Sequence, residues 1–161
     1  MVRRLYPNAG EVNLTDRELP APEMPADLGP GDIELRLAAD LVNLPIVRSV
    51  VATIATRADF DLDAIADLRL AVDEACSTLI TRAVPGTTMR CRFTATDDEL
   101  CFSGTAWIMN EKEPSTKSFG WRVLTTLTDS VHSQVTSNGQ HHRLDIELAK
   151  RRAVGVPGAG A

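Results

Sequence analysis

The sequence lacks an excess of basic residues and lacks long apolar runs. Lysine and arginine together number 17 against 22 aspartates and glutamates, which gives a net charge of −5. Because nucleic-acid binding relies on cationic side chains that neutralise phosphates, we expect no direct contact with nucleic acid. No apolar run approaches the roughly 20 residues that span a bilayer, and no apolar segment follows the charges at Arg3 and Arg4. We therefore expect a cytoplasmic protein that makes no contact with a membrane.

Cysteine and histidine are also scarce, and their spacing does not suit a metal centre. The three cysteines, Cys76, Cys91 and Cys101, show no C-x-x-C spacing, and an odd number does not fit a disulfide framework. We expect them to pack as buried thiols. The neighbours His141 and His142 would point to opposite faces of a strand, so they cannot share a metal ion.

The composition predicts one domain between two tails. A chain of 161 residues with 43% apolar content can close a single core. Residues 1–30 carry five prolines among acidic residues, a composition that favours a disordered arm. Residues 151–161 are rich in small residues and are expected to form a flexible tail, with the basic triplet Lys150–Arg152 as a solubilising end. The folded domain is therefore expected over residues 31–150.

Apolar spacing predicts both strands and helices in this domain. Ile33, Leu35 and Leu37 alternate with charged residues, as in a half-buried strand. A helical stripe begins at Leu44, where Asn43 is expected to act as the N-cap. The predicted order is strand, helix, helix, strand, strand, helix, strand, strand, at about residues 33–37, 44–54, 63–83, 89–96, 99–105, 120–128 and a last hairpin across Asn138-Gly139.

The two predicted hairpins fix which residues face each other. A two-residue turn in the first hairpin places Phe93 opposite Phe102 and makes one face apolar. Asn138-Gly139 suits a type I′ turn, which in the second hairpin places Val131 opposite Ile146. The order of elements predicts an α+β fold, a two-layer α/β sandwich in which a mixed or antiparallel sheet is covered by helices on one face.

Polar residues on the long helix provide the first candidate for chemistry. Glu74, Thr78 and Arg82 follow one another at i, i+4 and i+8, so they lie on one stripe beside the apolar face and would line a cleft. Spacing alone does not distinguish this interpretation from an ordinary solvated helix surface. The wider pattern of motifs is more specific.

Over about residues 31–150 the chain resembles the anti-sigma-factor serine kinases of the RsbW and SpoIIAB type, in the GHKL ATPase superfamily. The family has an Asn followed five residues later by an Arg, matched by Asn43 and Arg48. Its N-box, Glu-Ala-x-x-Asn, is matched by Glu74–Thr78, and its Asp-x-Val before the penultimate strand by Leu127–Val131. The resemblance implies the Bergerat-type fold of GHKL ATPases.

The resemblance implies Mg-ATP as the cofactor and a catalytic role for Glu74. This residue takes the place of the general base that accepts a proton from a partner's serine hydroxyl. Thr78 replaces the Asn that holds Mg²⁺ through its amide oxygen, and its shorter hydroxyl makes direct coordination of the metal unfavourable. Thr78, Arg82, Ser118 and Gly120 are the implied cofactor-binding residues.

Two further nucleotide motifs are eroded. Residues 103–108 replace Asp-x-Gly-x-Gly, so the carboxylate that reads adenine is absent, and Trp107 is expected in the loop that covers the nucleotide in relatives. The last glycine motif reads Ser118-Phe119-Gly120, which keeps one glycine at a helix N-terminus where a phosphate can bind. An unpaired polar edge in a buried pocket costs roughly 1–3 kcal/mol, so we expect weak or absent ATP binding.

The implied function is binding of another protein. In the family, the residues matched by Asn43 and Arg48 belong to the surface that contacts both the sigma factor and its antagonist. We expect an anti-sigma factor that sequesters an alternative sigma factor of the general-stress or sporulation type, released by a STAS-type anti-anti-sigma partner. The alternative is an active serine kinase that phosphorylates this antagonist. A stand-alone ATPase domain of a histidine kinase is disfavoured, and relatives in the family suggest a homodimer.

Overall fold

The computed structural model describes residues 28–154. The arm expected over residues 1–30 lies almost wholly outside this range, as does most of the tail expected over residues 151–161. The strands and helices are β1 (Ile33–Ala38), the 3-10 turn η1 (Leu41–Asn43), α1 (Leu44–Arg57), α2 (Leu62–Arg82), β2 (Thr88–Ala95), β3 (Glu99–Ile108), α3 (Phe119–Leu127), β4 (Ser130–Asn138) and β5 (His141–Arg151). Within the described residues, no helix has the length and apolarity to cross a bilayer.

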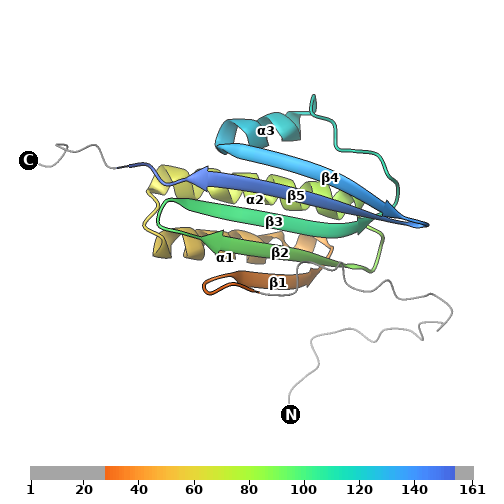
Figure 1. Cartoon of the computed structure of the whole chain (residues 1–161), viewed down its shortest axis with the longest axis horizontal. Helices are drawn as coiled ribbons and strands as arrows, with labels where there is room; N and C mark the ends of the chain where they lie inside the picture. Colours follow the sequence, from red (N-terminus) through yellow and green to blue (C-terminus); the bar gives the residue numbers. More distant parts are fainter. Residues whose placement is uncertain (1–27, 155–161) are drawn as a thin grey trace, which may run out of the picture.

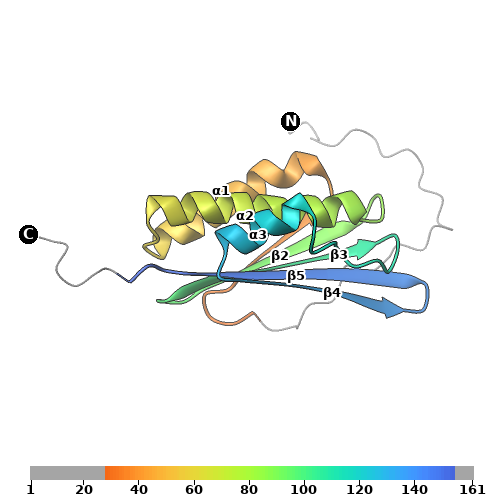
Figure 2. The same cartoon turned by 90° about the horizontal axis from the view of Figure 1, so that it is seen from above.

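The fold is a two-layer sandwich. Five strands form one antiparallel sheet in the order β1-β2-β3-β5-β4. All three α-helices lie on the same face of this sheet, with α2 between α1 and α3, and the opposite face is uncovered by helices (Figures 1 and 2). The predicted order of elements and the predicted fold class are thus confirmed, with the sheet antiparallel throughout.

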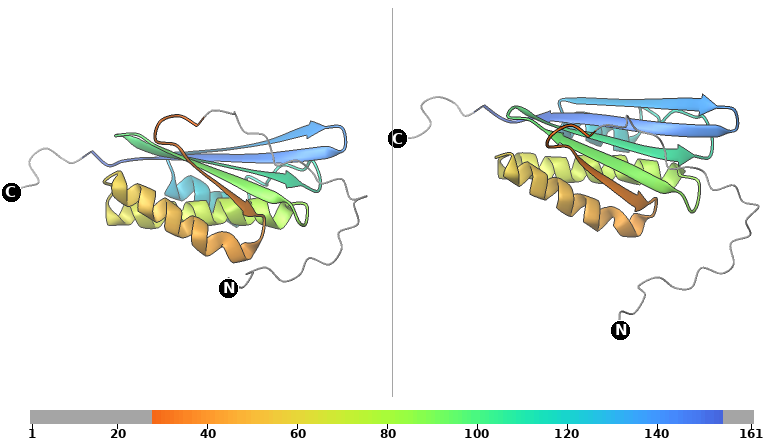
Figure 3. Two further views of the ribbon diagram at one scale, coloured as in Figure 1. Left: turned by 90° about the horizontal axis from the view of Figure 1, so that it is seen from below. Right: turned by 60° about the horizontal axis from the view of Figure 1, so that its bottom comes forward.

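The core lies between the sheet and the helices. Alternate residues of β2, β3 and β5 point toward α1 and α2, which run side by side beneath the sheet in Figure 3. The rings of Phe93 and Phe102 lie opposite each other, with centroids 5.3 Å apart. This pair confirms the register predicted for the first hairpin. From α2, the residues Leu68, Val72 and Leu79 are completely buried against this layer.

The second hairpin differs from its predicted register by two residues. Val131 lies opposite Leu148 instead of Ile146. Asn138 pairs with His141, so the two loop residues are Gly139 and Gln140, and Gly139 has a φ of +64°. A positive φ at the first loop residue alone suits a type II′ turn. A shift of two residues keeps every side chain on the same face, so the apolar pattern could not detect the error.

The start of α1 also differs from the prediction. Asn43 makes no side-chain capping bond. Its amide instead donates a 2.9 Å hydrogen bond to the carbonyl of Ala38, and so ties the end of β1 to the start of the helix. The preceding turn η1 is capped by Asp40, whose carboxylate accepts from the N–H of Val42 at 3.0 Å. Asn43 thus occupies the N-cap position of α1 as predicted, but the side-chain capping bond is made by Asp40, at the start of the 3-10 turn.

Candidate functional site

The predicted stripe on α2 lies half-buried along the helix. Glu74, Thr78 and Arg82 all have intermediate exposure. The hydroxyl of Thr78 donates a 3.0 Å hydrogen bond to the carbonyl of Glu74, one turn earlier. This back-bond orients the Thr78 side chain toward its own helix and uses its only proton.

Helix α3 meets α2 at Glu74. Ser118 caps α3, because its hydroxyl accepts a 3.1 Å hydrogen bond from the N–H of Trp121 and donates one of 2.8 Å to the carbonyl of Ser115. Gly120 lies directly against Glu74: a Cβ built on Gly120 would overlap the Glu74 Oε1 atom and lie 3.0 Å from its Cδ. The carboxylate of Glu74 therefore occupies space that any other residue at position 120 would need.

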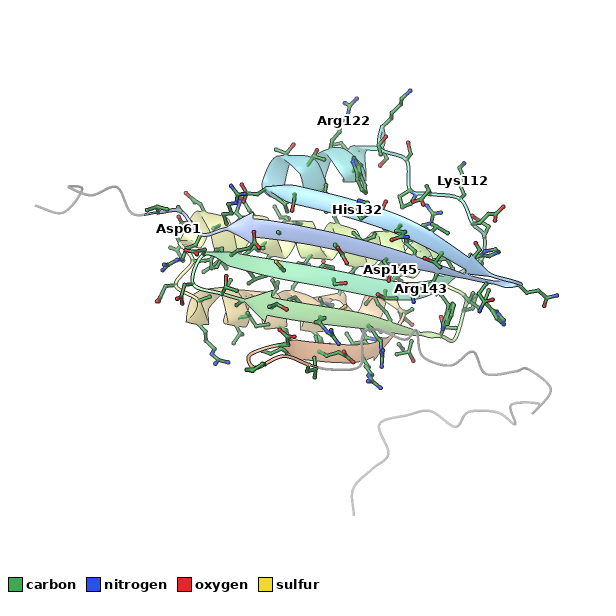
Figure 4. The ribbon with its side chains drawn as sticks, in the orientation of Figure 1. Asp61, Lys112, Arg122, His132, Arg143 and Asp145 are labelled. Carbon is green, nitrogen blue, oxygen red and sulfur yellow. The ribbon has the colours of Figure 1, made fainter. Side chains whose placement is uncertain are left out.

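A cavity of about 340 Å³ lies at the C-terminal end of α2, beside the loop that joins β3 to α3. Figure 4 shows Lys112 projecting from this loop and Arg122 pointing outward from α3. Glu113 fixes the loop to the edge strand β4, where its carboxylate accepts from the N–H of Val135 at 2.9 Å. The cavity lining is Thr81, Arg82, Met109, Asn110, Lys112, Glu113 and Ser115. Of the predicted cofactor residues, only Arg82 lines it.

These residues do not fit Mg-ATP. Among residues 28–154, no group of three His, Cys, Asp or Glu side chains is placed to hold a metal ion. The carboxylate of Glu74 faces Gly120, and the Thr78 hydroxyl is bonded to its own helix. Strand β3 continues without a break to Ile108, so the segment that should form a glycine-rich loop is regular strand. The structure thus brings Glu74 and Gly120 together but separates both from the cavity at Arg82.

Trp107 is not in the loop where it was expected. It lies on β3, opposite Arg143 of β5, and its ring is 6.0 Å from that of His141. Residues at alternate positions of a strand point to opposite faces, so Trp107 shares the uncovered face with Ser103 and Thr105. It cannot cover a nucleotide on the helical side. Trp121, in contrast, packs against the core under α3.

Of the predicted partner-binding residues, Arg48 lies on the side of α2 that faces α1, away from the contact between Glu74 and α3. Arg48 of α1 forms an ion pair with Asp73, with 3.3 Å between Nε and Oδ1, and the two side chains remain 41% and 30% exposed. Ile46 and Leu70 are apolar side chains with large exposed areas, at 49% and 59%. Sequence reasoning missed Asp73, although its signal was present, since antiparallel helices joined by a short turn place Asp73 opposite Arg48.

The uncovered face of the sheet is polar and carries a second cavity of about 470 Å³. Figure 4 shows His132, Arg143 and Asp145 on this face. Asp145 accepts hydrogen bonds from Thr105 at 2.8 Å and from Arg143 at 3.0 Å. Within this cavity, burial and a hydrogen bond to Glu99 raise the pKa of the Cys101 thiol to about 11.

The same face carries a cluster of charges around Glu34 on β1. Arg36 lies 2.8 Å from the Glu34 carboxylate, Arg92 3.1 Å and Arg90 3.7 Å. The hydrogen bond from Arg36, followed by that from Arg92 and the charge of Arg90, lowers the pKa of Glu34 despite its burial. The sequence pattern marked Glu34 and Arg36 only as the solvated side of a strand, because the cross-strand partners were unknown.

Comparison with known proteins places this architecture in a family. Residues 37–146 match the family model of the histidine kinase-like ATPase domain. The anti-sigma-F factor RsbW of Mycobacterium tuberculosis, from strains CDC 1551 / Oshkosh and ATCC 25618 / H37Rv, is in each case 43% identical over 101 residues, which are 63% of this chain. The chain spans about 60% of the length of these relatives.

A solved structure supports the fold. The crystal structure of the RsbU and RsbW domains of Rv1364c from Mycobacterium tuberculosis matches 78% of this chain and 34% of that chain, with a TM-score of 0.53 and 11% identity. At this identity the likeness shows the fold alone. The family match, in contrast, covers more than half of the sequence and includes α1, α2, α3 and most of the sheet. The chain therefore belongs to the family of histidine kinase-like ATPase domains, for which ATP is the general ligand, and is similar to the anti-sigma factor RsbW.

Proposed function

We propose that the chain is an anti-sigma factor, which binds an alternative sigma factor and withholds it from transcription. The observation that carries this proposal is the surface around Arg48. This side chain is partly exposed and is paired with Asp73 of α2, and the exposed Leu70 lies one turn before Asp73. The similarity to an anti-sigma-F factor supports the same function.

The physical properties of this surface suit a protein partner. Arginine is enriched among interface residues that dominate binding energy, because it combines a fixed charge with an apolar stem. Leu70 is exposed one turn before Asp73 on α2, and its burial by a partner would add apolar area beside the charge. Asn43 serves a different purpose here: its amide is bonded to Ala38, so we propose that it shapes the start of α1 and does not contact the partner directly.

Substitution of Arg48 tests the proposal. Arg48→Ala should weaken binding to the cognate sigma factor by about 30-fold, equivalent to about 2 kcal/mol for the loss of an arginine anchor. The melting temperature should change little, because an ion pair this exposed contributes at most about 1 kcal/mol. Surface plasmon resonance would measure the affinity. Arg57→Ala, at the exposed end of the same helix, is the matched control.

Release by a STAS-type anti-anti-sigma protein is the second part of the proposal. If both partners use the surface around Arg48, increasing concentrations of the antagonist should displace labelled sigma factor, and Arg48→Ala should weaken both complexes. Simultaneous binding of both partners would contradict a shared surface. The uncovered sheet face is the surface that we propose for a homodimer, since helices cover the other face, and sedimentation velocity would measure it.

The alternative proposal is a serine kinase that phosphorylates the antagonist with Glu74 as general base. Its support is the family of ATPase domains and the presence of a carboxylate at this position. Its difficulty is that Glu74 lies against Gly120 and that Thr78 is not placed as a metal ligand. Incubation with labelled ATP, magnesium and the antagonist distinguishes the two proposals. Transfer of label that Glu74→Gln abolishes would establish the kinase.

A further inference from the structure

The contact between Glu74 and Gly120 is closer than ordinary packing between helices. A Cβ at position 120 would overlap Oε1 of Glu74 and lie 3.0 Å from Cδ and 3.5 Å from Cγ. Real Cβ atoms essentially never approach other atoms closer than 3.0 Å. The absence of a side chain at Gly120 is therefore what admits the carboxylate to the first turn of α3.

The first turn of α3 provides a favourable environment for this carboxylate. The initial N–H groups of a helix have no partner within the helix and carry partial positive charge. In α3, the N–H of Trp121 is bonded to the Ser118 hydroxyl and that of Arg122 to the Ser118 carbonyl. The N–H groups of the two earlier residues have no intrahelical acceptor, so a carboxylate beside Gly120 meets the positive end of the helix. Among residues 28–154 the carboxylate of Glu74 makes no ion pair and no hydrogen bond, so it interacts with these N–H groups through its charge.

Helix α3 is only shallowly buried, with Trp121 and Leu127 partly buried against the core. It has nine residues, of which only Leu124 is fully buried. At its other end, Lys150 of β5 donates a 2.9 Å hydrogen bond to the carbonyl of Leu127 and forms a 3.2 Å ion pair with Asp67 of α2. A charged side chain from a neighbouring element thus lies at each end of α3, Glu74 at the N-terminus and Lys150 at the C-terminus.

We propose that Glu74 is an internal ligand of α3: its carboxylate takes the place at the helix N-terminus that a phosphate would require, and so holds the helix closed against α2. The residue at the position of a catalytic base thereby acts as a positioning residue. This role needs no nucleotide, no metal and no partner protein. It also accounts for the glycine that remains from an otherwise eroded glycine motif.

A double-mutant cycle tests this role. In a helix, Ala is favoured over Gly by about 1 kcal/mol, which corresponds to about a fivefold gain in the folding equilibrium constant. Gly120→Ala should fail to give this gain in the wild type, because the new methyl group expels the Glu74 carboxylate. In the Glu74→Ala background the same substitution should give the gain in full. Urea unfolding of the four full-length chains would measure a coupling of about fivefold or more between the two positions.

Two additional variants distinguish the steric contact between Glu74 and Gly120 from the effect of the Glu74 charge on α3. Glu74→Gln keeps the shape of the side chain but removes its charge, so it should retain the steric coupling and speed amide hydrogen exchange of residues 119–122 by about fivefold. Thr78→Ala, one turn away on the same helix, should combine additively with Gly120→Ala. Additive effects of Glu74→Ala and Gly120→Ala, or unchanged exchange in Glu74→Gln, would overturn the proposal. Because these measurements use the chain alone, they are independent of whether it binds a sigma factor.

Discussion

Replacement of Glu34 is the most informative perturbation of the sheet. Its side chain is 9% exposed, and the side chains of Arg90 and Arg92 are 10% and 14% exposed, so these three charges are largely removed from water. Arg36, the fourth member of the cluster, is 59% exposed. Glu34→Gln would remove the carboxylate charge that faces the two mostly buried arginines at alternate positions of β2.

The expected loss of stability follows from these exposures. A hydrogen bond to a charged group contributes roughly 1.5–3 kcal/mol, and breaking a fully buried ion pair costs roughly 3–5 kcal/mol. The exposed Arg36 should contribute little. Glu34→Gln should therefore lower the free energy of unfolding by about 2 kcal/mol at neutral pH, and the melting temperature by roughly 4–8 °C for a chain of this size.

The lowered pKa of Glu34 determines how the stability difference between wild type and Glu34→Gln should change with pH. Arg36, then Arg92 and Arg90, lower the pKa of Glu34 below its ordinary value of 4.5. A carboxylate with a lowered pKa in the folded state stabilises the fold above its ordinary pKa, and this contribution is lost as the pH falls through the folded-state pKa. The difference between wild type and Glu34→Gln should thus be constant at pH values above the ordinary pKa of 4.5. It should shrink below that pH and disappear once the pH has fallen through the lowered pKa of Glu34.

Urea unfolding followed by circular dichroism at several pH values would measure this difference. The matched control is Glu147→Gln, an exposed carboxylate on the same sheet face, which should change stability by less than about 0.5 kcal/mol. Equal stability of wild type and Glu34→Gln at neutral pH would refute the reasoning. So would a difference that persists unchanged in acid, because packing rather than charge would then be its cause.

Three further substitutions or reactions test other parts of the structure. Gly104→Ala should destabilise the fold by about 1–3 kcal/mol in urea unfolding, because its methyl group would lie 2.6 Å from Cδ1 of the buried Leu79. Cys101 should react with iodoacetamide at pH 8 about 100-fold more slowly than a free cysteine, as followed by mass spectrometry, since its pKa is raised to about 11 and only the thiolate reacts. Lys150→Met should lower stability by about 1–2 kcal/mol and speed hydrogen exchange at the end of α3, because it removes the bond to the Leu127 carbonyl.

Each of these predictions has a control or a contradicting result. Leu79→Ala should relieve part of the effect of Gly104→Ala, and strict additivity of the two would place the strain elsewhere. Labelling of Cys101 at the rate of a free cysteine would show that the thiol is not shielded. Arg151→Met, at the exposed neighbour of Lys150, should leave α3 unchanged, and equal effects of the two would indicate a general loss of charge.

The sequence predicted the order of elements and the first hairpin because these depend on local information. The register of β2 and β3 followed from a two-residue turn and an apolar face, and the Phe93–Phe102 pair confirms it. The second hairpin was wrong by two residues, since Val131 finds an apolar partner in either register and only the turn type separates them. Local patterns thus determine faces of a strand more reliably than partners across it.

The candidate site was harder to predict because it depends on contacts between distant segments. Glu74 and Gly120 were both identified, but their contact was not, because a family motif gives residue types and does not give distances. The extension of β3 placed Trp107 on the wrong face for a nucleotide pocket. Lys150 was interpreted as part of a solubilising end, although its side chain joins β5 to both α2 and α3. Long-range pairing was the missing information in each case.

Two consecutive residues of α2, Asp73 and Glu74, contact the two neighbouring helices. Asp73 reaches Arg48 on α1, whereas Glu74 reaches Gly120 on α3, since side chains one position apart on a helix diverge by about 100°. The helix itself is fixed, because its inner residues are completely buried, and a shift would disturb the close-packed core. Helix α3 buries far less, so it is the element with the lower cost of movement. Binding of a partner at Arg48 and a movement of α3 would therefore act on two neighbouring side chains of a rigid helix, Asp73 and Glu74. Any movement at this site is expected in these side chains and in α3, and not in α2.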